Sequence, residues 1–156
     1  MIYIFDTGSL SKLKHYPPSI FKKLWADLSE FVDTGLLIST KEVWNEMERG
    51  EPVPFVNDWL KSHKALFTTP SAQELLFVAE IFQVTHFQQL IGELQRLKGT
   101  PVADPFVIAC AKIHGGTVVT EEKFKPNAAK IPNVCKYYGI ECIDFAGFMT
   151  NQKWEF

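Results

Sequence analysis

The sequence predicts an α/β fold, a three-layer α/β/α sandwich around a mostly parallel sheet of four or five strands. Short apolar runs that end in turn residues alternate with longer segments of helical periodicity, which is typical of a parallel sheet covered on both faces. Hydrophobic residues make up 46% of the chain, which argues against disorder. The 156 residues suffice for one domain with a core but not for two ordinary ones, so we expect a single domain over 1–156.

The first predicted strand, residues 2–5, is the one around which the sheet is organised. Its four apolar residues run directly into a turn sequence at 6–9. A continuous apolar run that ends in a turn signal indicates a strand buried on both faces, at the centre of a sheet. Similar but weaker patterns predict strands at 36–38, 117–120 and 140–143, and a minor strand at 66–67.

Helical spacing of apolar residues accounts for most of the remaining chain. Ser71 with Glu74 forms a capping-box pattern, and Asp104 before Pro105 is typical of an N-cap followed by proline in the first turn. The stretch between 8 and 17 is expected to be irregular. The predicted helices span 18–33, 41–49, 55–64, 71–98 with a break near 84–86, 104–114, 133–138 and 144–149.

Several functional classes are disfavoured by what the sequence lacks. No apolar run approaches the roughly 20 residues that span a bilayer. The N-terminal apolar run has no basic segment before it and stops at Asp6, so we do not expect a signal peptide. The three cysteines are an odd set without CxxC spacing, which favours a reduced, cytoplasmic protein with cysteines in its core. The four histidines lack HxxxH spacing and are expected to be structural or exposed.

The charge of the chain is nearly balanced, with a formal net value of −2. The whole molecule is therefore not a strong electrostatic attractor for nucleic acid. Local basic groups occur at Lys12 and Lys14, after the first strand, and at Lys123 and Lys125, after the third of the main strands. Each group could contact phosphates. It could equally well be part of a solvated loop surface.

Four carboxylates are placed where a parallel sheet binds ligands. Asp6 follows the first strand, Asp104 opens a helix, Glu46 lies on the second helix and Glu122 follows the strand at 117–120. Ligands of open α/β sheets lie outside the carboxyl ends of the strands. Carboxylates from separate elements suit Mg²⁺ or Mn²⁺, and two such ions suit phosphodiester hydrolysis. We therefore predict a metal-dependent nuclease site.

Each assignment has an ordinary alternative. Asp6 is also a common turn residue, and Asp104 is also a helix cap. Glu42 and Glu48 compete with Glu46 as solvated or functional acids on the same helix, and Glu121 is the substitute for Glu122. The hydroxyls of Thr7 and Ser9 are expected either to orient Asp6 or to satisfy the backbone of the turn.

These residues resemble the PIN-domain superfamily over nearly the whole chain, in the order found in that family. The blocks are Phe-Asp-Thr-Gly-Ser at 5–9, Val-Trp-Asn-Glu-Met at 43–47, Ala-Asp-Pro-Phe-Val-Ile-Ala-Cys-Ala at 103–111 and Val-Val-Thr-Glu-Glu at 118–122. Proline follows Asp104 where many members have alanine, and Glu122 stands where aspartate is commoner. The segment 134–142 looks like an uncharacterised prokaryotic PIN-like branch.

The resemblance implies an endoribonuclease that holds Mg²⁺ or Mn²⁺ and acts as a toxin neutralised by an antitoxin protein. It also implies an RNA substrate and, as in many members, a homodimer. The main alternative is a PIN-like module that binds RNA or protein without cutting. Residues 5–9 also match the aspartic protease motif. That chemistry needs a second aspartate from a second copy of the motif, and this chain has no second copy. Aspartic proteases are also all-β proteins, whereas this sequence predicts several helices.

Overall fold

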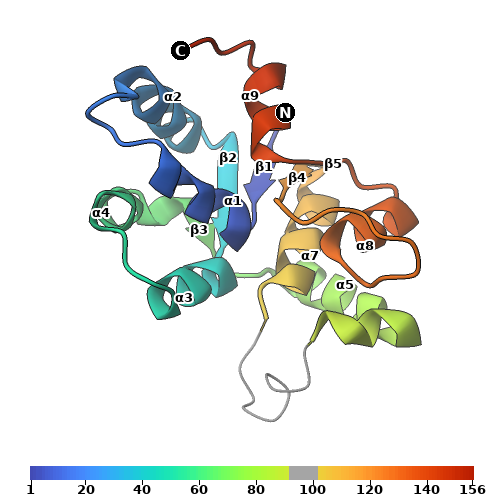
Figure 1. Cartoon of the computed structure of the whole chain (residues 1–156). Helices are drawn as coiled ribbons and strands as arrows, with labels where there is room; N and C mark the ends of the chain where they lie inside the picture. The colour runs from blue at the N-terminus through green and yellow to red at the C-terminus, as the bar shows by residue number, and fades with distance from the viewer. Residues whose placement is uncertain (92–101) are drawn as a thin grey trace.

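The computed structural model describes residues 1–91 and 102–156 and confirms the predicted α/β fold (Figure 1). Its strands form one five-stranded sheet, in the order β3-β2-β1-β4-β5, in which every neighbouring pair is parallel. The strands are β1 (Tyr3–Phe5), β2 (Leu37–Thr40), β3 (Phe67–Thr68), β4 (Thr117–Val119) and β5 (Cys142–Ile143). β1 is central and fully buried, as its continuous apolar sequence predicted.

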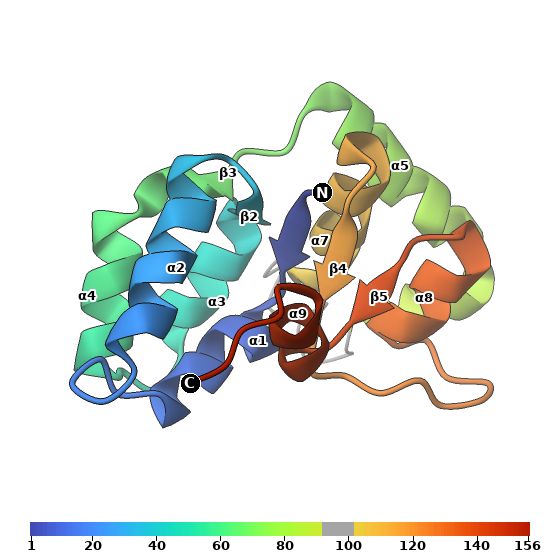
Figure 2. The same cartoon turned by 90° about the horizontal axis from the view of Figure 1, so that it is seen from above.

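Helices cover both faces of the sheet. The described helices are α1 (Thr7–Ser11), α2 (Lys22–Asp33), α3 (Lys41–Arg49), α4 (Pro54–Ser62), α5 (Ala72–Gln83), α7 (Asp104–His114), α8 (Ile131–Tyr138) and α9 (Phe145–Asn151). Short 3-10 turns occur at Lys12–His15, Lys64–Leu66 and Thr85–Leu90. In Figure 2, α7 and α5 lie on one side of β1 and β4, and α9 lies on the other. No helix in the described ranges is long and apolar enough to cross a membrane.

An aromatic cluster fixes α9 against the sheet. The ring of Phe148 meets the rings of Tyr3 and Phe5 edge to face, with centroids 4.9 and 5.1 Å apart. It also contacts Phe31 of α2 at 5.6 Å and Trp154 of the C-terminal tail at 5.3 Å. Such pairs each contribute about 0.5–1.5 kcal/mol beyond the area that they bury. The half-buried Trp154 therefore packs the C-terminal tail against the core.

Two consecutive glycines connect α7 to β4. Gly115 ends the helix with a left-handed backbone, φ +64°, which glycine adopts without strain. At Gly116 a Cβ atom would lie 2.5 Å from Cδ1 of Ile4 and 2.7 Å from the carbonyl oxygen of Ile2. Only a residue without a side chain lets β4 begin this close to β1.

Helix α1 is the main feature that the sequence did not predict, since the stretch after Asp6 was expected to be irregular. Its sequence, Thr-Gly-Ser-Leu-Ser, has low intrinsic helix propensity. The backbone amide of Leu10 nevertheless donates to the Asp6 carbonyl at 3.1 Å, and Leu10 and Leu13 are fully buried. Burial of these two leucines therefore outweighs the local preference.

Other helix boundaries shift for local reasons. The helix expected from 18 begins at Lys22, because residues 18–20 form a turn after the two prolines. The helix expected from 133 begins at Ile131, with Pro132 accommodated in its first turn. The predicted break near 84–86 is confirmed, because Val84 is extended between α5 and a 3-10 turn. The end of the long predicted helix, 92–98, lies outside the described residues.

Candidate active site

The structure brings Asp6, Glu46, Asp104 and Glu122 to one end of the sheet. Asp6 directly follows β1, and its amide donates to the Val119 carbonyl at the end of β4, at 2.9 Å. Glu46 lies on α3, Asp104 is the first residue of α7, and Glu122 lies three residues beyond β4. Figure 1 shows α3 and the beginning of α7 on either side of the carboxyl end of β1. The negative charges of the other three acids raise the pKa of Asp104, which places all four within electrostatic reach.

Asp104 is the most perturbed of these acids. Its pKa is raised to about 8, mainly by burial and further by the charges of Asp6, Glu122 and Glu46 in that order, while Lys130 opposes the increase. The prediction that Asp104 caps α7 is wrong, because Ala103 occupies the N-cap position with a helical backbone, φ −72° and ψ −30°. Within the described residues, no protein donor hydrogen-bonds to the Asp104 carboxylate. Its oxygens thus keep their capacity to bind a cation.

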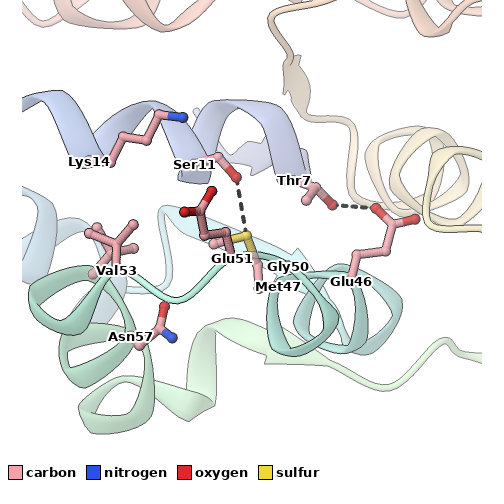
Figure 3. Close-up of a pocket in the computed structure, with 10 residues that line it drawn as sticks. Thr7, Ser11, Lys14, Glu46, Met47, Gly50, Glu51, Val53 and Asn57 are labelled. Atoms are coloured by element: carbon pink, nitrogen blue, oxygen red, sulfur yellow. Dashed lines mark hydrogen bonds between the residues drawn. The ribbon is translucent and has the colours of Figure 1, made fainter.

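Glu46 connects three helices. Its Oε1 accepts a hydrogen bond from Oγ1 of Thr7 on α1 at 2.6 Å, which is drawn in Figure 3. Its Oε2 accepts from the backbone amide of Ala103, the residue before α7, at 3.0 Å. Of the competing acids on α3, Glu48 is exposed. Glu42 lies near Glu74, whose charge helps to raise its pKa.

Asp6 is buried, with 5% of its surface exposed, and a residue missed by the sequence analysis holds it. Thr120, just beyond β4, donates from its hydroxyl to Oδ2 of Asp6 at 3.0 Å. Burial raises the pKa of Asp6 to about 6, although hydrogen bonds from the Thr7 amide and Thr120 oppose this, and Glu122 and Glu46 add to it. The pairing of β1 with β4 explains this contact. The two strands are parallel neighbours, so the residues that follow them lie side by side at the carboxyl end of the sheet.

The two adjacent glutamates have different surroundings. Oε2 of Glu122 accepts from the amide of Ile131, at the start of α8, at 2.9 Å. Oε2 of Glu121 accepts from the amide of Phe145 at 2.9 Å and from the Ser9 hydroxyl at 3.4 Å. Glu121 therefore fastens α9 and α1, whereas Glu122 is the one that acts on the pKa values of Asp6 and Asp104. The hydroxyls of Thr7 and Ser9 thus contact Glu46 and Glu121, and not Asp6 as one interpretation expected.

The predicted basic residues divide into three kinds. Nζ of Lys12 lies 3.8 Å from Oε1 of Glu121, and Nζ of Lys123 lies 3.2 Å from Oδ2 of Asp144. Lys125 is exposed on the loop before α8. Lys14 lines a cavity beside the carboxylates. Lys130, which lowers the pKa of Asp104, is a further cation close to the acidic site.

The cavity beside Glu46 has a volume of about 180 Å³ and lies between α1, α3 and α4 (Figure 3). Figure 3 shows Lys14 and Ser11 on one wall and Met47 and Asn57 on the other. Its lining combines apolar, amide, hydroxyl and charged groups, and Thr7 and Glu46 form its inner edge. Of the four acids, Glu46 is the one that lines this cavity, so a ligand bound there would lie next to Glu46.

Residues 3–156 match a protein family described as a domain of unknown function, DUF4411. The chain belongs to this family. DUF4411 is a PIN-like family, so the predicted resemblance is confirmed. No protein with a curated description matches the chain in sequence.

Solved structures show the same fold at low sequence identity. One is VapBC2 from Rickettsia felis bound to a DNA fragment from its promoter (14% identity, 93% of this chain and 99% of that chain, TM-score 0.55). Another is DNA-bound VapBC from Salmonella typhimurium (17% identity, 92% and 98%, TM-score 0.51). A third is VapBC-1 from nontypeable Haemophilus influenzae (14% identity, 94% and 99%, TM-score 0.53). The parallel α/β sheet also excludes the all-β architecture that the aspartic protease alternative requires.

The donor atoms of the DUF4411 site suit hard divalent cations. Its four side chains offer carboxylate oxygens only, which are the ligands that Mg²⁺ and Mn²⁺ prefer. Burial is the main cause of the raised pKa values of Asp6 and Asp104, and the charges of the neighbouring acids add to it. A bound divalent cation would offset the negative charges of these carboxylates while leaving them deprotonated.

Proposed function

We propose that this DUF4411 protein is a metal-dependent endoribonuclease and the toxin of a toxin–antitoxin pair. The observation that supports the nuclease most directly is the convergence of four acids from four different segments. Burial, together with the negative charges of the other three acids, raises the pKa of Asp104 to about 8. Such a cluster destabilises the metal-free fold, so it is better explained by a functional requirement than by stability.

In this proposal Asp6, Asp104 and Glu122 hold one or two Mg²⁺ or Mn²⁺ ions, and Glu46 completes the acidic site. A divalent cation in such a site lowers the pKa of a water molecule and offsets charge on a phosphate. The chain itself positions the acids: Thr120 fixes Asp6, and Thr7 fixes Glu46. These hydrogen bonds orient the carboxylates, and contacts of this kind typically change metal affinity by about 10–100-fold.

The cavity beside Glu46 provides a place for the nucleic acid strand next to the acids. Met47 and Val53 offer apolar contacts for a base or ribose, Asn57 offers hydrogen bonds, and Lys14 offers a charge to a phosphate. Lys130, whose charge lowers the pKa of Asp104, is a second cation that could contact a phosphate near the acids. Because the chain has a net charge of −2, binding of RNA depends on these local cations and on the bound metal ions.

The toxin role and the partner rest on the likeness to chains of VapBC complexes. We propose an antitoxin protein as partner, a homodimer as the assembly of the chain itself, and the cytoplasm as the place of action. Expression of the chain alone in bacteria should stop growth, while the Asp104→Asn variant should not. Co-expression with the proposed antitoxin should restore growth. Normal growth with active, soluble chain would argue against the toxin role while leaving the nuclease intact.

The nuclease is tested with purified protein on mixed RNA and single-stranded DNA, in Mn²⁺, in Mg²⁺ and in EDTA. We expect cleavage of RNA with either metal and none in EDTA. Asp104→Asn should abolish cleavage, and Asp58→Asn, at an exposed position on α4, is the matched control that should retain it. Equal cleavage by both variants would contradict the site. Metal and RNA binding without cleavage by the wild type would instead favour the non-cleaving PIN-like module.

A further inference from the structure

A second group of potential metal ligands lies at the other end of α7. Glu74, Cys110 and His114 each offer one ligand atom, and these atoms all lie within 4.8 Å of one another. Cys110 and His114 are four residues apart and so project from the same face of α7. Glu74 belongs to α5, which packs against α7. The group therefore bridges two helices.

Glu74 is held rigidly in this group. Its Oε2 accepts from the Ser71 amide at 3.1 Å, and its own amide donates to the Ser71 hydroxyl at 3.1 Å, as the capping-box pattern predicted. Its Oε1 lies 3.1 Å from Nε2 of His114. Glu74 is only 3% exposed. A buried carboxylate is thus already oriented toward the imidazole before any ion binds.

A further carboxylate lies within electrostatic reach of the group. Glu42 on α3 has a buried oxygen, Oε2, without a hydrogen-bond partner in the described part of the chain. Burial raises the pKa of Glu42, and the charge of Glu74 contributes to the increase. Burial together with Glu74 and Glu42 raises the pKa of the Cys110 thiol to about 12. An unpartnered buried oxygen costs free energy unless some donor or cation satisfies it.

We infer that Glu74, Cys110 and His114 form a Zn²⁺ site, with Glu42 as the nearest further carboxylate. Thiolate, imidazole and carboxylate are the ligands that Zn²⁺ takes in proteins, and three of them leave one position for water or another acid. The thiol and imidazole select against Mg²⁺, so this site and the four-carboxylate site would hold different metals.

Binding at this site has a defined proton balance and a structural consequence. The Cys110 thiol loses its proton to solvent, and the thiolate and the neutral His114 nitrogen then coordinate the ion. The ion would cross-link the start of α5 to the end of α7. Cys110 is separated from Asp104 by six residues, or about 9 Å along the helix axis, so the two sites are distinct. The inference does not depend on the nuclease function.

The test uses the full chain, freed of metal with a chelator and kept reduced, and then titrated with Zn²⁺ and with Co²⁺. We expect about one Zn²⁺ per chain, a near-ultraviolet thiolate-to-cobalt absorption band and a rise in melting temperature with Zn²⁺. Cys110→Ser should remove the band and the bound zinc. Because Cys110 is buried, His114→Gln at an exposed position serves as the second variant, and it should also remove the zinc.

Two control variants separate this site from others. Asp104→Asn removes an acid of the nuclease site, and Cys135→Ser removes a buried cysteine of α8; both should keep the zinc and the cobalt band. Zinc binding that survives both Cys110→Ser and His114→Gln would overturn the inference, as would a folded wild type that binds no zinc. A lower melting temperature of His114→Gln without any zinc binding by the wild type would mean that His114 and Glu74 form only an ion pair.

Discussion

Replacing Asp104 by asparagine should stabilise the metal-free protein while destroying its function. The amide has nearly the same shape as the carboxylate but carries no charge near Asp6, Glu46 and Glu122. In the folded chain the pKa of Asp104 is about 8, against an ordinary value of 3.8. The folded state therefore binds a proton more tightly than the unfolded state, and the charged form opposes folding.

The size of the effect follows from this pKa difference. Each unit corresponds to about 1.4 kcal/mol, so the roughly three units between the ordinary value and pH 7 set a ceiling of about 4 kcal/mol. Relaxation and entry of water reduce such penalties, so we expect about 1–3 kcal/mol. For a chain of this length, that corresponds to an increase of about 3–9 °C in melting temperature.

The sign of the pH dependence distinguishes this cause from others. A raised carboxyl pKa makes the wild type lose stability as the pH rises from about 4 to about 8, because the folded state holds the extra proton across this range. The Asp104→Asn variant has no ionisable group at this position, so it does not lose stability in this way as the pH rises. The advantage of Asp104→Asn should therefore be greatest near pH 8 and shrink toward pH 4.

The assay is thermal unfolding in EDTA between pH 5 and pH 8, repeated with saturating Mn²⁺. Mn²⁺ should raise the melting temperature of the wild type and have little effect on Asp104→Asn, because a ligand stabilises the state that binds it. Asp58→Asn, which removes one exposed carboxylate elsewhere, should match the wild type throughout. If Asp104→Asn is less stable than the wild type at pH 8 in EDTA, the reasoning that the buried charge of Asp104 opposes folding is refuted.

Three further predictions follow from other contacts of the structure. Glu122→Gln should abolish RNA cleavage, whereas Glu121→Gln should retain it. Glu121→Gln should instead lower the free energy of unfolding by about 1–3 kcal/mol, because it loses the charged hydrogen bonds of Glu121. The reverse pattern in cleavage assays would exchange the roles of the two glutamates. Gly116→Ala should lower stability to urea by about 1–3 kcal/mol or more, because its Cβ would overlap the neighbouring strand. Gly50→Ala, whose Cβ meets nothing nearer than 3.5 Å, is the control and should be nearly neutral. Thr120→Val should weaken Mn²⁺ binding by about 10–100-fold in calorimetry, and unchanged affinity would show that its hydroxyl does not position the site.

The elements that sequence could predict are those whose local pattern and tertiary environment agree. β1 combines a continuous apolar run with central burial, and α5 combines a capping box with a helical apolar face. Helix α1 lacks that agreement, because its local sequence favours a turn and only the burial of Leu10 and Leu13 makes it helical. Its existence depends on neighbours that no local window contains.

The same reasoning explains what sequence could say about the acids. In a parallel α/β sheet, the carboxyl ends of the strands and the beginnings of the following helices lie at the same end of the sheet. Asp6 and Asp104 could therefore be assigned to that end without knowing any contact. The choice between Glu121 and Glu122 could not be made, since it depends on which amide each carboxylate meets, at Phe145 or at Ile131. The role of Thr120 likewise required the strand order.

The beginning of α7 departs from the local capping rule. Aspartate before proline at a helix start normally satisfies the free amides of the first turn. Here Glu46, from another helix, accepts the hydrogen bond from the Ala103 amide, and the Asp104 carboxylate is left without a donor. A carboxylate that already accepts hydrogen bonds from its own helix has less capacity for a cation. Because Asp104 does not cap α7, its carboxylate stays available to the site, at the cost in metal-free stability that Asp104→Asn should recover.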